Sequence, residues 1–90
     1  AEKEFSAYNF EHANTDNLFK MFDMFELEAK ALVEKKLSLP AYDQCLKASH
    51  VFNILDARGV ISVAQRADYI GRIRGITKGA AEIWLNSQTK

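Results

Sequence analysis

The sequence predicts an all-α fold, a small bundle of three main helices with an irregular N-terminal arm. Apolar residues recur at steps of three and four along most of residues 15–86, which is the period of amphipathic helices. Helix-capping residues, one proline and one glycine divide this pattern into three segments. No stretch alternates apolar and polar residues as a half-buried strand does. Because 90 residues suffice for one small core, we expect residues 1–90 to form a single helical domain.

The arm is predicted over residues 1–14, which show no helical period. Phe5, Tyr8 and Phe10 are spaced as anchors within this otherwise polar segment. Three aromatic side chains so close together need a surface to pack on. That surface can belong to another domain, in which case the chain begins within a longer protein.

The first helix is expected from about residue 15 to Lys36. Asn14 or Thr15 is a good N-cap, and Asp16 in the first turn is favoured by the helix dipole. Lys35 and Lys36 are expected in the last turn, where cations are favoured. One apolar stripe follows the helical period: Leu18, Met21, Phe22, Phe25, Ala29, Leu32 and Val33.

A second and weaker apolar stripe lies on the opposite side of this helix and consists of Met24, Leu27 and Ala31. A helix that is apolar on two sides usually contacts two neighbours. The second neighbour is expected to be a domain outside the chain or a partner subunit.

The second helix is expected from about Ala41 to Ala57, with Pro40 at its first position. Its apolar residues extend most of the way around, which is typical of a central helix packed by both neighbours. They are Tyr42, Cys45, Leu46, Ala48, Val51, Phe52, Ile54 and Leu55. Cys45 is therefore expected to be a buried, inert thiol.

The third helix is predicted from Val63 to about Asn86. Gly59 lies just past the second helix, where a left-handed residue is common. Ser62 and Gln65 then match a capping box. The expected core face is Tyr69, Ile70, Ile73, Ile76, Thr77, Ala80, Ile83 and Trp84.

Composition excludes several classes of function. No run of 18 or more apolar residues is present, so we expect no membrane partner, and the polar N-terminus is no signal peptide. The single cysteine excludes an internal disulfide and suits a reducing compartment.

The sequence also offers no pattern of a metal or catalytic site. His12, His50 and Cys45 lack the spacing of a zinc site. Ser49 and His50, as neighbours on a helix, point about 100° apart and form no dyad. We predict no metal site and no catalytic residue.

The net charge of zero conceals an asymmetry between the two halves of the chain. Residues 1–43 hold nine acids and five lysines, whereas residues 44–90 hold three acids and seven bases. All four arginines lie between positions 58 and 74. This clustering indicates either a local anionic partner or a solvated face with intramolecular ion pairs. Asp56, Arg58 and Arg66 are the candidates for a structural ion-pair cluster that fixes the angle between the second and third helices.

Three glycines follow one another at four-residue steps on the third helix: Gly71, Gly75 and Gly79. Each costs a helix interior about 0.8–1 kcal/mol relative to alanine. On a helical wheel this stripe lies opposite the core face and is flanked by Arg74 and Lys78. It is either a close-packing stripe for another helix or a sugar-phosphate chain, or a solvated face without a role.

Several segments together resemble one family. They are Tyr8-Asn9-Phe10-Glu11, Leu39-Pro40-Ala41-Tyr42-Asp43, residues 49–62 and Tyr69-Ile70 with Arg72-Ile73-Arg74. In order and spacing they resemble the C-terminal helical region of the α subunit of bacterial two-subunit glycyl-tRNA synthetase. The resemblance covers about residues 5–87.

The resemblance implies a class II glycine-tRNA ligase that works as an α2β2 assembly in the cytoplasm and uses ATP and Mg²⁺. The catalytic domain of such an α subunit precedes the region seen here, so no catalytic residue is carried over and the chain alone is expected to be inactive. The implied partners are the β subunit, a second α subunit and the glycine tRNA; DNA is not expected.

The region is also similar to the helical tRNA-recognition domain of alanyl-tRNA synthetase, where an arginine-rich helix faces the acceptor stem. This similarity implies docking of the tRNA acceptor stem by the third helix. The candidate tRNA contacts are Arg66, Arg72, Arg74 and Lys78, with His50 and Asn53 as polar readers. The alternative is a structural interface module for α–α or α–β assembly, without direct contact to RNA.

Overall fold

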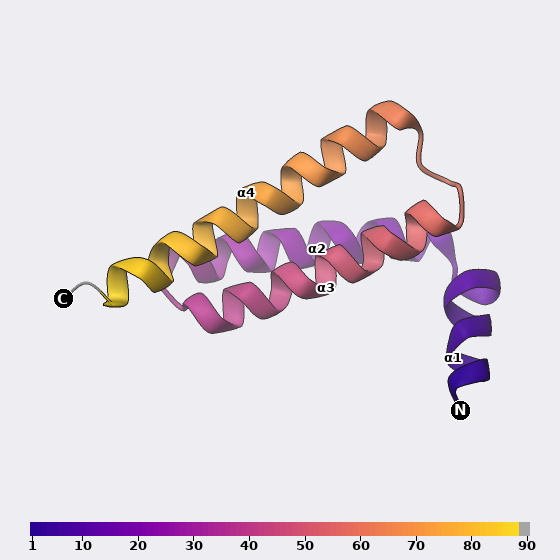
Figure 1. Ribbon diagram of the computed structural model, residues 1–90, viewed down its shortest axis with the longest axis horizontal. Coiled ribbons are helices and arrows are strands. Elements are labelled where there is room, and N and C mark those ends of the chain that lie inside the picture. Colours follow the sequence, from indigo (N-terminus) through magenta and orange to yellow (C-terminus); the bar gives the residue numbers. More distant parts are fainter. Residues whose placement is uncertain (89–90) are drawn as a thin grey trace.

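The structure is a computed structural model that describes residues 1–88. Its elements are α1 (Glu2–Ala7), the π-helix η1 (Tyr8–His12), α2 (Thr15–Glu34), α3 (Ser38–Ala57) and α4 (Val63–Gln88). The described residues contain no strand, which confirms the all-α prediction with three main helices and an N-terminal arm. Figure 1 shows α2, α3 and α4 as one flat bundle, with the arm projecting from one end. The principal extents are 48 × 34 × 17 Å.

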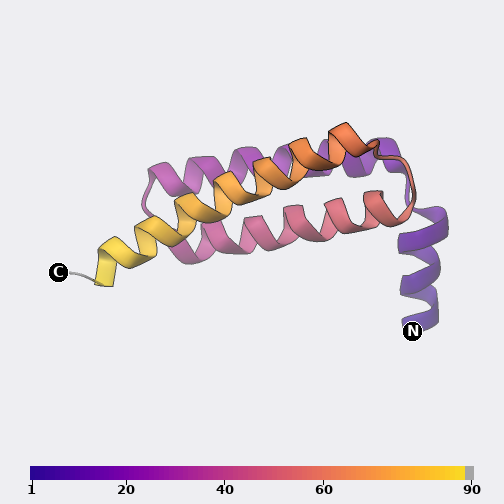
Figure 2. The same cartoon turned by 45° about the horizontal axis from the view of Figure 1, so that its top comes forward.

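The core lies between the antiparallel pair α2–α3 and the long helix α4. In Figure 2, α4 crosses over this pair, running from the end that carries the arm toward the opposite end. Phe22 of α2 and Leu55 of α3 are fully buried at the centre. Tyr69 of α4 packs edge-on against Phe22, with ring centroids 4.7 Å apart. Aromatic packing of this kind anchors α4 to the pair.

The end of α2 differs from the prediction. The helix ends at Glu34, so Lys35 and Lys36 follow its last turn instead of lying in it. The amides of Lys36 and Leu37 donate to the carbonyls of Val33 and Leu32, which is the Schellman arrangement. It places Lys36 at φ 61°, a left-handed conformation that glycine normally adopts at lower cost.

The start of α3 lies three residues earlier than predicted. The helix begins at Ser38, so Pro40 occupies its third position and not its first. The first helical hydrogen bond runs from the amide of Ala41 to the carbonyl of Leu37, 3.0 Å away. The missing N–H of Pro40 therefore falls in the first turn, where backbone donors have no helical partner.

The junction between α3 and α4 has the predicted construction. Gly59 has φ 72° and ends α3 in a second Schellman arrangement, in which the amide of Val60 reaches the carbonyl of Leu55. Ser62 and Gln65 form the reciprocal capping box, with hydrogen bonds of 2.9 and 3.1 Å. At the same end of the bundle, the side chain of Asn14 caps α2 by accepting a hydrogen bond from the amide of Asn17.

The arm is helical rather than irregular, which corrects the prediction for residues 1–14. Phe5, Tyr8 and Phe10 are all more than half exposed, so no buried face imposes an apolar period on this segment. The prediction relied on that period and could not detect a helix without a buried face. The guanidinium of Arg58 donates to the carbonyl oxygen of Ala13 at 2.8 Å and holds the base of the arm against the end of α3.

Cys45 is a buried free thiol, as predicted. Its burial raises the pKa of the thiol, against a smaller opposing contribution from a hydrogen bond with Thr77. A thiol of this kind is a core side chain and not a nucleophile.

Two further observations concern the whole described chain. None of its helices is long and apolar enough to cross a membrane. Residues 1–88 also contain no group of three or more metal-ligating side chains.

Candidate nucleic-acid interface

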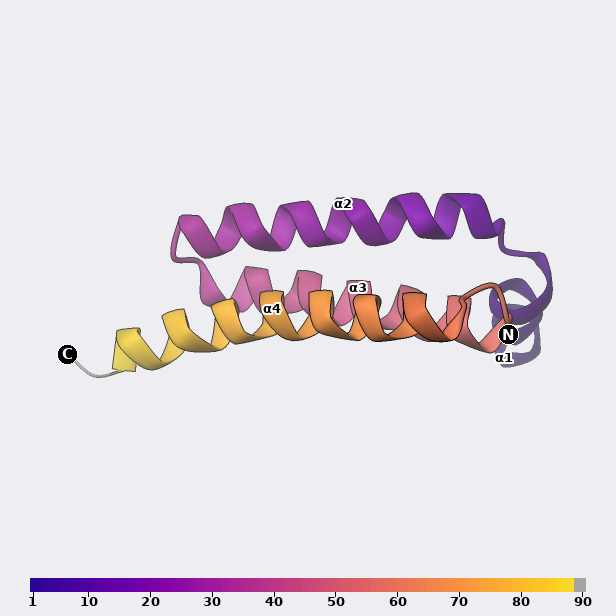
Figure 3. The ribbon, with the colours of Figure 1, turned by 90° about the horizontal axis from the view of Figure 1, so that it is seen from above.

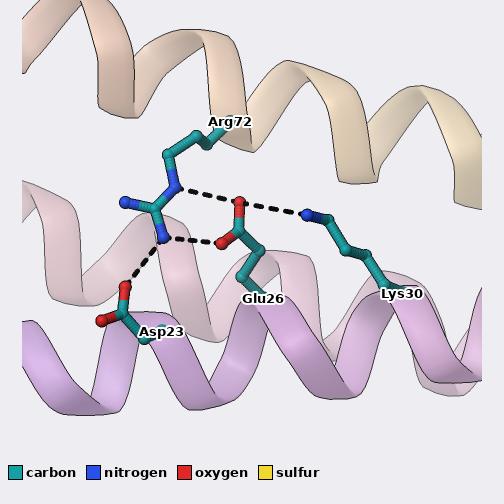
Figure 4. Close-up of polar contacts among 4 residues, drawn as sticks. All are labelled: Asp23, Glu26, Lys30 and Arg72. Atoms are coloured by element: carbon teal, nitrogen blue, oxygen red, sulfur yellow. Dashed lines mark hydrogen bonds and ion pairs between the residues drawn. The ribbon is translucent and has the colours of Figure 1, made fainter.

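Arg72 projects from α4 toward α2 and makes three side-chain hydrogen bonds to acids there. Its Nε and Nη2 atoms donate to the two carboxylate oxygens of Glu26 at 3.0 and 2.6 Å, and Nη2 also donates to Asp23 at 2.7 Å. Figure 4 shows Arg72 reaching down from α4 to both acids on α2. A bidentate guanidinium–carboxylate pair is among the strongest and most directional polar contacts in proteins. It therefore joins α4 to α2 in a fixed register.

Glu26 is the buried half of this pair, with only 8% of its surface exposed. The hydrogen bond from Arg72 lowers the pKa of Glu26, which outweighs the opposing effect of burial. Lys30 approaches the same carboxylate to 3.9 Å and adds a weaker contact. The guanidinium of Arg72 also lies 4.8 Å from the ring centre of Phe22 and 5.0 Å from that of Tyr69. Carboxylates and aromatic rings thus surround the guanidinium of Arg72, whose charge is already paired within the domain.

The predicted ion-pair cluster at the α3–α4 junction is divided between two sites. Arg66 contacts Asp56 through Nε at 3.1 Å and through Nη2 at 2.7 Å. Arg58 takes no part in this pair; its Nη1 lies 2.8 Å from the carbonyl of Ala13 and 3.5 Å from that of Asn9. Asp56 and Arg66 therefore form an ion pair across the turn into α4, whereas Arg58 contacts the arm.

Arg74 and Lys78 are one helical turn apart, and both are exposed on the outer side of α4. Within residues 1–88 neither side chain makes an ion pair. Gly71 and Gly75 lie beside them, and a Cβ atom added at either glycine would meet no atom within 4 Å. This part of α4 therefore combines two unpaired cations with backbone that no side chain covers. We define Gly71, Arg74, Gly75 and Lys78 as the outer face of α4; Gly75 lies at its edge, where it also lines a groove with Lys30 and Glu34 of α2.

Gly79 does not belong to this outer face. A Cβ atom at Gly79 would lie 3.4 Å from both methyl groups of Val33 on α2. Four residues turn a helix by about 400°, so each step along the stripe rotates it by roughly 40° toward α2. The predicted close-packing stripe thus begins in open space at Gly71 and ends against a neighbouring helix at Gly79.

A family model described as glycyl-tRNA synthetase alpha subunit matches residues 1–89. The chain belongs to the glycyl-tRNA synthetase alpha subunit family. This membership confirms the resemblance found in the sequence. It makes the chain part of a family of tRNA ligases, whose substrates and partners include tRNA and other subunits.

Other residues of this synthetase chain that the sequence suggested for tRNA contact lie apart from the outer face of α4. His50 lines a shallow apolar groove formed by α2 and α3 only, together with Met21, Phe25, Leu46, Lys47 and Val51. Asn53 is exposed on α3, three residues further along. The six candidates therefore do not form one surface: Arg66 and Arg72 bind acids within the domain, and His50 lies on a groove to which α4 does not contribute.

Sequence reasoning missed the acids that bind Arg72. A signal was present, because Glu26 follows Phe22 by four residues and precedes Ala29 by three, which places it within the apolar stripe of α2. A carboxylate at such a position is rarely buried without a partner. The arginine that pairs with it lies 46 residues away in sequence. Asp23 is exposed and gave no signal of its own.

Proposed function

We propose that this chain is the helical tRNA-docking part of a glycine-tRNA ligase α subunit, and that it receives the acceptor stem on the outer face of α4. The observation that supports the proposal is the difference in how the basic residues are used. Arg72 joins α4 to α2 and Arg66 pairs with Asp56, whereas Arg74 and Lys78 are unpaired among the described residues and lie beside bare helix backbone.

This arrangement suits a sugar-phosphate backbone. Cations that carry no internal partner can replace the counterions of a phosphate chain, which gives affinity and position without reading sequence. Double-stranded RNA is recognised largely by its shape and through its phosphates and 2′-hydroxyls. Gly71 and Gly75 would let such a chain approach α4 closely, since neither presents a side chain.

The chemical steps of glycylation are assigned to residues outside this chain. Glycine activation requires ATP and Mg²⁺ in the parent enzyme, and no residue described here is proposed to bind either one. Binding of the tRNA would therefore be the contribution of this chain, and the isolated chain should form no glycyl-adenylate. Pyrophosphate exchange by the purified chain would contradict this assignment.

The test is charge reversal in the assembled synthetase. Arg74→Glu and Lys78→Glu should each weaken tRNA binding and reduce the slope of log affinity against log salt by about 0.7–0.9, one phosphate contact each. Lys3→Glu, an equally exposed lysine on the arm, is the matched control and should change neither quantity. Binding measured by filter retention over a salt series gives both values. Unchanged affinity and slope in both α4 variants would contradict the proposal.

A second candidate function is a structural interface module that does not touch RNA. The observation in its favour is the number of exposed large apolar side chains, among them Phe5 and Tyr8 on the arm and Met24 and Leu27 on α2. Exposed apolar patches often mark subunit contacts. If this candidate is right, the two α4 variants leave tRNA affinity unchanged, and substitution of the apolar residues prevents assembly.

A further inference from the structure

The link between the arm and the bundle is short and extended. Ala13 (φ −58°, ψ 133°) and Asn14 (φ −70°, ψ 117°) interrupt the helical backbone between η1 and α2. Helical hydrogen bonding resumes with the amide of Leu18, which donates to the carbonyl of Asn14. Each residue of the link contributes two soft torsions. The direction of the arm therefore has to be set by contacts outside the link.

One side chain of α3 supplies polar contacts of this kind. The guanidinium of Arg58 donates to the carbonyl oxygen of Ala13 at 2.8 Å, and its Nη1 lies 3.5 Å from that of Asn9. Figures 1 and 3 place the arm at the end of the bundle where α3 ends. The three aromatic side chains of the arm are more than half exposed, and within residues 1–88 no ion pair joins the arm to the bundle. Ala13 is buried, which holds the link in place but does not direct the arm.

The position of Arg58 suits it to this contact. Arg58 is the C-cap of α3, and Ala13 is the C-cap of η1. The last carbonyl groups of a helix lack helical partners and carry partial negative charge, so a cation is favoured beside them. The guanidinium thus lies at the C-terminal ends of two helices and joins one to the other. Asp56, two residues earlier on α3, is already paired with Arg66 and does not compete for it.

We propose that Arg58 is a positioning residue for the glycylation of tRNA. It sets the angle between the arm and the bundle, and thereby places the outer face of α4 relative to the catalytic domain that the family resemblance puts before the arm. The proposal rests on the proposed function, because the bundle has to hold the tRNA. Arg58 acts through the arm and not by contact with RNA.

The geometry of the arm makes this angle important. Residues 1–12 form a lever roughly 18 Å long at 1.5 Å per residue, so a rotation of about 10° at the link displaces its far end by about 3 Å. Misplacement of reacting groups by about 1 Å can lower a rate on the order of 100-fold. Loss of the Arg58 contact should therefore affect the transfer of glycine to tRNA, whereas the activation of glycine needs no tRNA and should not change.

Kinetics of the assembled synthetase test the proposal. Arg58→Met keeps the aliphatic stem and removes the donors. It should leave pyrophosphate exchange unchanged and lower kcat for tRNA glycylation about tenfold or more, with KM for tRNA changed less than about twofold. Arg58→Lys keeps the charge and can donate to one carbonyl, so it should recover part of the loss. Lys47→Met removes an exposed cation of α3 about three turns from Arg58; it is the matched control and should change none of these values.

The outcomes separate this proposal from the proposed function. An unchanged kcat in Arg58→Met overturns the positioning role. So does an equal loss of pyrophosphate exchange, which indicates a general defect, or a loss that Arg58→Lys does not relieve. Failure of the proposed function appears in other variants, as normal tRNA affinity of Arg74→Glu and Lys78→Glu, whatever the kinetics of Arg58→Met.

Spin labels on the chain measure the orientation of the arm directly. Labels at Glu4→Cys and Asp43→Cys report the distance from the arm to α3, and labels at Glu28→Cys and Asp43→Cys report the bundle alone. All three positions are exposed, and Cys45 is buried and should take up little label. Arg58→Met should broaden the first distance distribution and leave the second unchanged. A first distribution as narrow as in the unmodified chain overturns the proposal.

Discussion

Arg72 and Arg74 are two residues apart on one helix and have opposite environments. The guanidinium of Arg72 is held by two acids and lies over two aromatic rings. Arg74 is exposed and makes no ion pair within the described chain. Two positions on a helix are about 200° apart, so neighbouring arginines can serve the two sides of α4. The comparison teaches that a cluster of arginines in sequence has to be divided by helix face before any of them is assigned to a nucleic acid.

The largest expected difference between the two arginines is in the stability of the fold. Arg72→Met retains an apolar stem over Phe22 and Tyr69 but leaves the carboxylate of Glu26 buried without its main partner. We expect a loss of about 2–3 kcal/mol in the free energy of unfolding, below the usual cost for a fully buried pair because Arg72 is partly solvated. Arg74→Met should change it by no more than about 0.5 kcal/mol. Urea denaturation followed by circular dichroism measures both.

A compensating change sharpens this prediction. Replacing both partners, Arg72→Met with Glu26→Leu, removes the unpaired charge and should recover most of the loss. If the double variant is no more stable than Arg72→Met alone, the loss came from packing and not from the stranded carboxylate. Equal destabilisation by Arg72→Met and Arg74→Met would remove the distinction between the two faces.

A smaller difference is expected in the dependence of stability on acid. Because Arg72 lowers the pKa of Glu26 in the folded state, Glu26 contributes stability above its unfolded pKa, which is about 4.3. This contribution is lost as the pH falls from there through the lowered folded pKa. The unmodified protein and Arg74→Met should therefore both lose stability below about pH 4, and Arg72→Met should lose less over the same range. Thermal unfolding between about pH 7 and pH 2.5 gives the comparison; parallel curves for all three proteins would contradict it.

The parts of the fold that could be predicted from sequence are those that depend on local chemistry. Ser62 and Gln65 cap α4 through bonds to each other, and Gly59 takes the left-handed conformation that its place after α3 requires. Each of these features is decided by residues within one turn of the helix end. The core of α2 was predictable for a similar reason, because a buried face imposes a period on the sequence.

The parts that could not be predicted depend on which helices meet. Nothing near Arg58 in sequence indicates that its guanidinium binds the carbonyl of Ala13, 45 residues earlier. The same applies to Arg72 and its partners on α2. The candidate site was predictable only as a set of basic residues: charge and spacing suggested Arg66, Arg72, Arg74 and Lys78, but only the packing of the helices shows that Arg72 binds acids on α2. Lys36 shows a third case, since its left-handed conformation follows from the tight connection to α3 and not from its residue type.

The smallest expected effects distinguish two glycines, Gly75 on the outer face of α4 and Gly79 against Val33. Gly75→Ala places a methyl group in open space and should stabilise the fold by about 0.5–1 kcal/mol through helix propensity alone. Gly79→Ala makes the same gain in helix propensity but adds a contact 3.4 Å from Val33, so its net gain in stability should be smaller.

The two glycine variants should also differ in tRNA binding by the assembled synthetase. If a phosphate chain approaches the outer face closely, Gly75→Ala binds tRNA more weakly despite its greater stability, and Gly79→Ala is unaffected. If both bind as the unmodified enzyme does, the bare backbone of α4 has no role in docking and only its two cations remain in the proposal.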